Sequence, residues 1–126
     1  PKEPNNARRF RAAFGRTLFV HLTRRGKIEQ AVSYVRAQQT GLWHAAPDGT
    51  ELERLSPHRE PVYDADGIRT CFEMLTDYDR DWEGWFRKEG IAPLSITYDA
   101  LSMDPLGTVR QILGELGLDP DAANGI

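Results

Sequence analysis

The chain alternates short apolar runs with longer stretches of helical periodicity. Residues 17–23 and 94–98 are short runs rich in β-favouring apolar side chains, and stretches whose apolar positions repeat every three to four residues follow them. The near-continuous apolar character of residues 17–23 is typical of a parallel strand that is covered on both faces. Strands that alternate with helices predict an α/β fold, with parallel strands flanked by helices.

Two of the predicted helices have clear amphipathic faces. The first spans residues 27–40 and stops at Gly41, and the second spans residues 64–89. Apolar and aromatic side chains gather on one face of the second helix. Trp82 and Trp85 belong to this face, and we interpret them as core packing rather than as a platform for a ligand.

The two ends of the chain carry weaker patterns. Residues 1–16 are interpreted as a linker and basic lead-in. The linker part is residues 1–7, which contain two prolines, two asparagines and nothing apolar to bury. A last helix is expected from Asp104 and Pro105 to Gly117, since an aspartate N-cap followed by proline is a frequent helix start. Residues 120–126 are interpreted as a tail.

Residues 41–63 are predicted to be mostly loop. They contain three prolines and an Asp48-Gly49 pair, which are residues that favour turns. A loop of this length in a compact domain is typically a lid, a binding loop or a disordered segment. His21 lies inside the first predicted strand, and we interpret it as a buried, hydrogen-bonded histidine rather than a catalytic one.

Composition excludes several classes of protein and site. The 126 residues are 40% hydrophobic and 28% charged, which is ordinary for a globular domain. Cys71 is the only cysteine, so a disulfide within the chain and a zinc site built on paired cysteines are excluded, and no metal site is predicted. We find neither a transmembrane segment nor a signal peptide, and we therefore expect a cytoplasmic protein.

Charge is distributed unevenly along the chain. Residues 1–36 carry nine basic and two acidic side chains, a net charge of +7, whereas residues 37–126 carry a net charge of −10. A basic end indicates an anionic partner, but the overall charge of −3 disfavours nucleic acid. Two strands alone would leave sheet edges open to pairing, so a homo-oligomer is an open possibility.

The first strand, the turn after it and the following helix form a candidate phosphate site. Arg24 and Arg25 follow the strand directly, the helix begins near Lys27, and Ser33 lies two turns into the helix. Guanidinium groups and the free N–H groups of a helix start both bind phosphate well. Ligands of open α/β sheets bind at the carboxyl ends of strands, where Tyr98-Asp99 of the second strand is also expected.

The spacing and the neighbours of this site resemble those of sulfotransferases that use PAPS as sulfuryl donor. These enzymes bind the 3′-phosphate with an arginine that ends a strand and a serine eight residues later, which is the spacing of Arg25 and Ser33. The flanking residues are similar to those of one branch, the bacterial carbohydrate sulfotransferases typified by mycobacterial trehalose 2-sulfotransferase. The matching residues are Arg24-Arg25, Lys27, Gln30-Ala31-Val32-Ser33, Ala37, Gln39-Thr40-Gly41, Trp43, Tyr63-Asp64, Glu73-Met74-Leu75-Thr76, Trp82, Ile96-Thr97-Tyr98-Asp99, Asp104-Pro105 and Gly117-Leu118.

The resemblance covers residues 17–119 and implies the carboxyl-terminal part of a P-loop-like sulfotransferase fold. It implies that PAPS and its product PAP are bound by Arg25 and Ser33 with help from Arg24, and that a sulfuryl group passes to a sugar hydroxyl. The family's amino-terminal strand, its phosphosulfate-binding loop and its usual catalytic base find no match here. We therefore assign no catalytic residue and expect the chain alone to be inactive.

A carbohydrate or glycolipid acceptor is the other partner that the resemblance implies. Gln39, Thr40, Trp43 and His44 follow the first helix and border the long loop, so they are the candidate acceptor contacts. Trp43 could stack on a sugar face and His44 could approach an acceptor hydroxyl, although packing and solvation explain both residues equally well. The sequence leaves the acceptor sugar undetermined.

Two further hypotheses come from other functional classes. The chain could be a nucleotide-binding domain that turns nothing over, or an α/β domain for protein interaction in which the arginine turn is incidental. Affinity for PAP compared with 5′-AMP separates these hypotheses, because a 3′-phosphate site prefers PAP.

Overall fold

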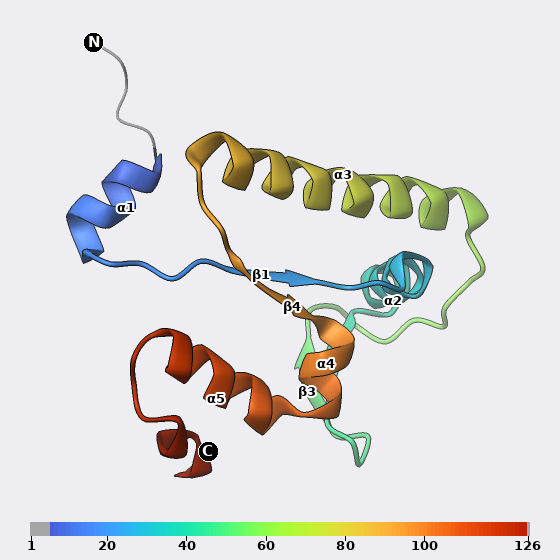
Figure 1. The fold of residues 1–126 in the computed structure, drawn as a ribbon. Coiled ribbons are helices and arrows are strands. Elements are labelled where there is room, and N and C mark those ends of the chain that lie inside the picture. Colours follow the sequence, from blue (N-terminus) through green and yellow to red (C-terminus); the bar gives the residue numbers. More distant parts are fainter. Residues whose placement is uncertain (1–5, 126) are drawn as a thin grey trace. The chain divides into compact units, whose positions relative to one another are not determined.

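The computed structural model describes residues 6–125, drawn in Figure 1. These residues form two compact units, which are described separately below: residues 6–25 with 80–125, and residues 26–79. Helix α3 (Ala65–Glu89) contributes its first part to the second unit and its last part to the first. No helix among the described residues combines the length and the apolar character needed to cross a membrane.

The first unit is built on two parallel strands, β1 (Val20–Thr23) and β4 (Leu94–Thr97). Val20 pairs with Leu94 and Thr23 with Thr97, so both strands end at the same edge of the sheet. The N–H of Leu94 also donates to the carbonyl of Phe19 at 2.8 Å. This pairing confirms the α/β class and the parallel strands predicted from the sequence.

Only one face of β1 is packed against other described residues of its unit. His21 is buried against the ring of Phe86 in α3, with 5.4 Å between the ring centres. Val20 and Leu22 face the other side of the sheet and are 40% and 51% exposed. The expectation of a strand covered on both faces is therefore wrong for the described residues. His21 is buried as predicted, but its Nε2 has no hydrogen-bond partner among them.

Aromatic rings form the packing between β1 and the end of α3. Phe19 makes edge contacts with Trp85 and Phe86, at 5.7 and 6.2 Å between ring centres, and Phe10 contacts Phe19 at 6.0 Å. Trp85 thus packs in the core as predicted. Trp82 touches the same cluster but stays 54% exposed, so it is only partly a core residue.

In chain order, helices precede β1 and follow β4 in this unit. Phe10 belongs to α1 (Asn6–Phe14), a helix that we did not predict within the basic lead-in. α4 (Tyr98–Met103) follows β4 directly, and α5 (Pro105–Glu115) opens with the predicted Asp104 cap, whose side chain accepts from the N–H of Gly107 at 2.9 Å. The segment expected to be a tail folds as a 3-10 helix, η1 (Pro120–Gly125). It packs on α5 and buries Ala123 completely.

The second unit contains α2 (Lys27–Thr40), the start of α3 and a hairpin of two strands. Ala31 and Val35 of α2 and Cys71 of α3 form its buried core, with Ile68 and Leu75 packed beside them. Both predicted helices are confirmed. Their apolar stripes account for this core, since residues three and four apart lie on the same helix face.

The hairpin is the largest difference from the sequence prediction. Strands β2 (Leu42–Ala45) and β3 (Glu51–Arg54) pair antiparallel inside the segment expected to be mostly loop. Gly41 joins α2 to β2 in a left-handed conformation, with φ of 76°, and its N–H donates to the carbonyl of Ala37. The hairpin buries little of either face, so the alternation that reveals a strand is missing from its sequence.

Candidate functional site

The carboxyl edge of the parallel sheet carries the two predicted arginines. Arg24 and Arg25 follow β1, and Tyr98 follows β4, whose end is paired with the end of β1. The guanidinium carbon of Arg24 lies 4.4 Å from the centre of the Tyr98 ring, a cation–π contact that fixes this side chain. Arg25 is exposed and makes no ion pair among the described residues of its unit. Of the two arginines, Arg25 therefore has the free guanidinium.

Helix α2 begins without a side-chain cap hydrogen bond. Its N-cap is Gly26, which has no side chain to accept from the first backbone N–H groups. The carboxylate of Glu29 lies nearby, because a Cβ added at Gly26 would be 2.6 Å from Oε2 of Glu29. Lys27 pairs with Asp79 and donates to Gln30 at 3.1 Å, so its ammonium group is already engaged. The start of α2 thus offers backbone donors and a positive dipole end.

Ser33 lies on the wall of a pocket of about 340 Å³ in the second unit. Arg36 and Thr40 line the same pocket from α2, and Trp43 lines it from β2. The hydroxyl of Ser33 is exposed and makes no hydrogen bond within the described unit. The pocket therefore contains three residues that the sequence singled out, together with Arg36, which it did not.

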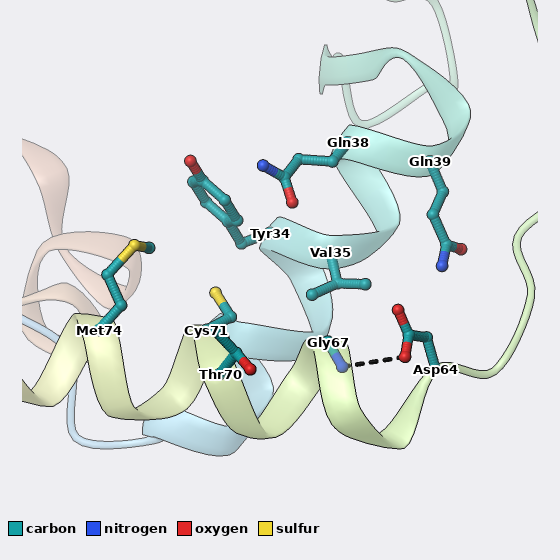
Figure 2. A pocket seen from close by; sticks show the side chains of 9 residues that line it. All are labelled: Tyr34, Val35, Gln38, Gln39, Asp64, Gly67, Thr70, Cys71 and Met74. Carbon is teal, nitrogen blue, oxygen red and sulfur yellow. Dashed lines mark hydrogen bonds between the residues drawn. The ribbon is translucent and has the colours of Figure 1, made fainter.

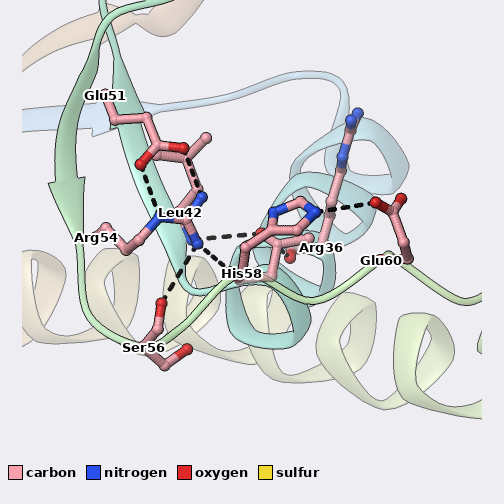
Figure 3. A network of polar contacts seen from close by, with 8 residues as sticks. Arg36, Leu42, Glu51, Arg54, Ser56, His58 and Glu60 are labelled. Carbon is pink, nitrogen blue, oxygen red and sulfur yellow. Dashed lines mark hydrogen bonds and ion pairs between the residues drawn. The ribbon is translucent and has the colours of Figure 1, made fainter.

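A polar network around Arg54 of β3 also lines this pocket, and Figure 3 shows its contacts. The guanidinium of Arg54 donates to both carboxylate oxygens of Glu51, at 2.7 and 2.6 Å. It also donates to the carbonyl of Thr40 at 2.7 Å and to that of Ser56 at 3.3 Å. The hydrogen bond from Arg54 lowers the pKa of Glu51, and Glu51 raises the pKa of Arg54 in return. The network ties the hairpin to the carboxyl end of α2.

A second charged pair completes the lining. His58 and Glu60 lie 2.9 Å apart, between Nε2 and Oε1, in the segment after β3. Figure 3 shows the guanidinium of Arg36 pointing away from this pair, and the side chain of Arg36 has no ion pair within the described unit. Each carboxylate of the pocket thus has a side-chain hydrogen-bond partner, Arg54 for Glu51 and His58 for Glu60, whereas Arg36 has no such partner within the described unit.

The structure brings only two of the four predicted acceptor contacts, Thr40 and Trp43, into one pocket. Trp43 lies in the pocket and meets the ring of Tyr34 edge-on at 5.5 Å. Thr40 is buried, and its hydroxyl donates to the carbonyl of Arg36 at 2.9 Å, so it is already engaged. His44 pairs with Glu53 across the hairpin and is exposed.

Gln39 lines a different pocket, between α2 and α3. This pocket has a volume of about 470 Å³, and Figure 2 shows Gln39 and Asp64 at one end and Met74 at the other. The side-chain oxygen of Gln39 accepts from the N–H of Val62 at 2.9 Å, which holds the segment before α3. Burial raises the pKa of the Cys71 thiol on the floor of this pocket.

Sequence reasoning missed Arg36, Arg54, His58 and Glu60 as lining residues. Arg36 lies three residues after Ser33, a spacing that places both on one helix face and could have indicated it. The others depend on the hairpin, which leaves no comparable signal. Arg25 belongs to the first unit and Ser33 to the second. Their convergence on one phosphate stays a prediction.

Comparison with known proteins gives a consistent result. The family described as Stf0 sulphotransferase matches residues 1–126. Trehalose 2-sulfotransferase of Mycobacterium tuberculosis (strain ATCC 35801 / TMC 107 / Erdman) is 36% identical over 108 residues, which cover 84% of this chain and 38% of the relative. The trehalose 2-sulfotransferase of Mycolicibacterium smegmatis (strain ATCC 700084 / mc(2)155) is 31% identical over 106 residues, with the same coverage. The chain spans 38% of the length of these relatives, and it belongs to the Stf0 sulphotransferase family.

Proposed function

We propose that the chain forms the nucleotide-recognition part of a carbohydrate sulfotransferase of P-loop-like fold. In this role Arg25 and Ser33 bind the 3′-phosphate of PAPS and of its product PAP. In the reaction of the whole enzyme, the acceptor hydroxyl oxygen bonds to sulfur and releases its proton, while the bond from sulfur to the 5′-phosphate oxygen breaks and PAP leaves. The residues described here act on the nucleotide and hold it in place, and we assign none of them a proton-transfer role.

The observation that carries this proposal is the free arginine at the edge of a parallel sheet. Arg25 is exposed, unpaired within its unit and placed where β1 ends, which is where α/β sheets bind ligands. Arg24 is held on the Tyr98 ring and contributes positive charge at the same edge. An arginine fork matches the oxygens of a phosphate dianion better than a single ammonium group does.

The start of α2 and Ser33 support the same assignment. The uncapped first turn offers backbone N–H groups to an anion, and helix N-termini are common phosphate sites. The Glu29 carboxylate lies near the same end and would compete with a phosphate for it. Ser33 keeps its hydroxyl free for a hydrogen bond to the ligand.

A sugar acceptor is proposed from two features. The relatives are trehalose 2-sulfotransferases by name, and Trp43 lies in the wall of the pocket that contains Ser33. An indole face and several polar side chains in one pocket are the usual means of holding a polyhydroxyl ligand. The acceptor contact that we retain from the prediction is Trp43. Gln39, Thr40 and His44 already have partners within the protein.

Calorimetry with PAP and 5′-AMP tests the proposed function. The two ligands differ by the 3′-phosphate, so we expect the wild-type chain to bind PAP at least about tenfold more tightly, since a charge-assisted hydrogen bond contributes roughly 1.5–3 kcal/mol. Arg25→Ala should reduce the affinity for PAP by about tenfold or more and leave that for 5′-AMP nearly unchanged.

A matched control separates a specific site from general charge. Arg87 is an exposed arginine in the last turn of α3, away from the sheet edge by sequence and element. Arg87→Ala should leave both affinities unchanged. Equal affinities of the wild-type chain for PAP and 5′-AMP, or an unchanged affinity of Arg25→Ala for PAP, would refute the assignment.

A further inference from the structure

Helix α2 presents one polar stripe to the pocket that contains Ser33. Ser33, Arg36 and Thr40 all line this pocket, and they follow one another at spacings of three and four residues. Side chains at these spacings are neighbours on a helix surface, with Cβ atoms about 5–6 Å apart. Arg36 is therefore the charged neighbour of Ser33 on the helix.

Among the charged side chains that line the pocket, only Arg36 has no side-chain partner within the described unit. Glu51 is held by Arg54 through two hydrogen bonds, and Glu60 is held by His58. Arg54 is further fixed by two backbone carbonyls. The guanidinium of Arg36 has no such contact and points away from the His58–Glu60 pair in Figure 3. Among the charged and hydroxyl-bearing side chains of this lining, Arg36 and Ser33 are thus the ones without a hydrogen-bond partner in the described unit.

We propose that Arg36 is a second guanidinium of the 3′-phosphate site and acts on the same anion as Ser33. This inference rests on the proposed function, because it takes Ser33 as a phosphate ligand. An arginine and a hydroxyl on adjacent turns can donate to different oxygens of one phosphate. The hairpin contributes through Arg54, which balances the charge of Glu51 so that this carboxylate does not repel the ligand.

The hairpin removes a repulsion that a phosphate would otherwise meet in the pocket. Glu51 would be an unfavourable neighbour for a phosphate if it were unpaired, since like charges repel. Its bidentate contact with Arg54 lowers the pKa of its carboxyl and balances its charge. The pocket therefore keeps an unpaired cation on α2, while Glu51 and Arg54 on the hairpin balance each other.

Binding measurements on Arg36 variants of the full chain test this inference. We expect Arg36→Gln to reduce the affinity for PAP by about tenfold or more while the affinity for 5′-AMP changes less than twofold. Arg36→Lys keeps the charge but loses the planar fork, so its affinity for PAP should lie between wild type and Arg36→Gln. The control is Arg59→Gln, because Arg59 is an exposed arginine of the same unit that does not line the pocket.

The outcomes distinguish this inference from the proposed function. If wild-type chain prefers PAP and Arg25→Ala abolishes the preference, but Arg36→Gln behaves like Arg59→Gln, then the assignment of Arg36 is wrong and the proposed function stands. If wild-type chain shows no preference for PAP, the proposed function fails and this inference fails with it. A loss of affinity for both ligands in Arg36→Gln with an unchanged melting temperature would also contradict the inference, because it would indicate an effect unrelated to the 3′-phosphate.

Discussion

Gly41 connects α2 to the hairpin, and its replacement by alanine should lower the free energy of unfolding by an amount that the structure allows to be worked out. Its φ of 76° is in the left-handed region, which costs an alanine about 1–2 kcal/mol relative to right-handed conformations. Loss of glycine entropy from the unfolded chain offsets about 0.4–1 kcal/mol of this cost. Backbone conformation alone therefore predicts a destabilisation of about 0.5–1 kcal/mol.

Contact with Ser56 adds a second and larger cost. A Cβ at position 41 would lie 2.6 Å from the carbonyl oxygen of Ser56 and 3.0 Å from its backbone nitrogen. These backbone atoms cannot rotate away, so the segment just after β3 must shift. A shift strains the bond from the N–H of Leu55 to the carbonyl of Gly41, now 2.8 Å, which contributes about 0.5–1.5 kcal/mol. The expected total for Gly41→Ala is about 1–2.5 kcal/mol.

Urea unfolding followed by circular dichroism measures this difference against a matched control. Gly49 has a φ of 86° in the hairpin turn, and a Cβ there would meet nothing within 4 Å. Gly49→Ala should therefore show only the conformational cost of about 0.5–1 kcal/mol. We also expect Gly41→Ala to weaken PAP binding, because the hairpin forms a wall of the pocket. Equal unfolding free energies for the two variants would refute the argument from the Ser56 contact.

Three further predictions concern single carboxylates. The hydrogen bond from Arg54 lowers the pKa of Glu51 below its ordinary value of 4.5. The ionised Glu51 therefore stabilises the fold above pH 4.5, and this stabilisation is lost as the pH falls through the lowered pKa. Glu51→Gln should accordingly flatten the pH dependence of the melting temperature below pH 4.5. Glu29→Gln should tighten PAP binding severalfold in calorimetry, because the carboxylate near the start of α2 repels a phosphate; an unchanged affinity would remove that end of α2 from the site. Asp104→Ala should lower the unfolding free energy by about 1 kcal/mol through loss of the bond from Gly107, whereas Asp104→Asn, which can still cap, should lie within a few tenths of wild type.

Sequence patterns predicted the helices and the parallel sheet because these elements depend on local periodicity. The stripe of Ala31 and Val35 recurs at helical spacing, and Gly41 ends the helix with the positive φ that a C-cap favours. The Asp104 cap followed by Pro105 was recognisable from two adjacent residues. In each case the signal lies within a few positions of the structure that it specifies.

The elements that were missed depend on contacts between distant residues. The strands LWHA and ELER have few buried positions, so no apolar alternation marks them, and Arg54 reaches back to Thr40 across 14 positions. The tail appeared unstructured because its small residues carry no period, although Ala123 is fully buried. The spacing of Arg25 and Ser33 was visible in the sequence, whereas the unmatched charge of Arg36 emerges only when the pairs around it are known.

A double-mutant cycle on Arg25 and Ser33 tests the central claim most directly. The affinity for PAP would be measured for wild type, Arg25→Ala, Ser33→Ala and the double variant, with 5′-AMP as the reference ligand. If both side chains hold the same 3′-phosphate, the losses for PAP should be non-additive by more than about 0.5 kcal/mol, and the affinities for 5′-AMP should be nearly equal in all four proteins. Losses that add to within about 0.3 kcal/mol, or that are the same for PAP and 5′-AMP, would contradict the account.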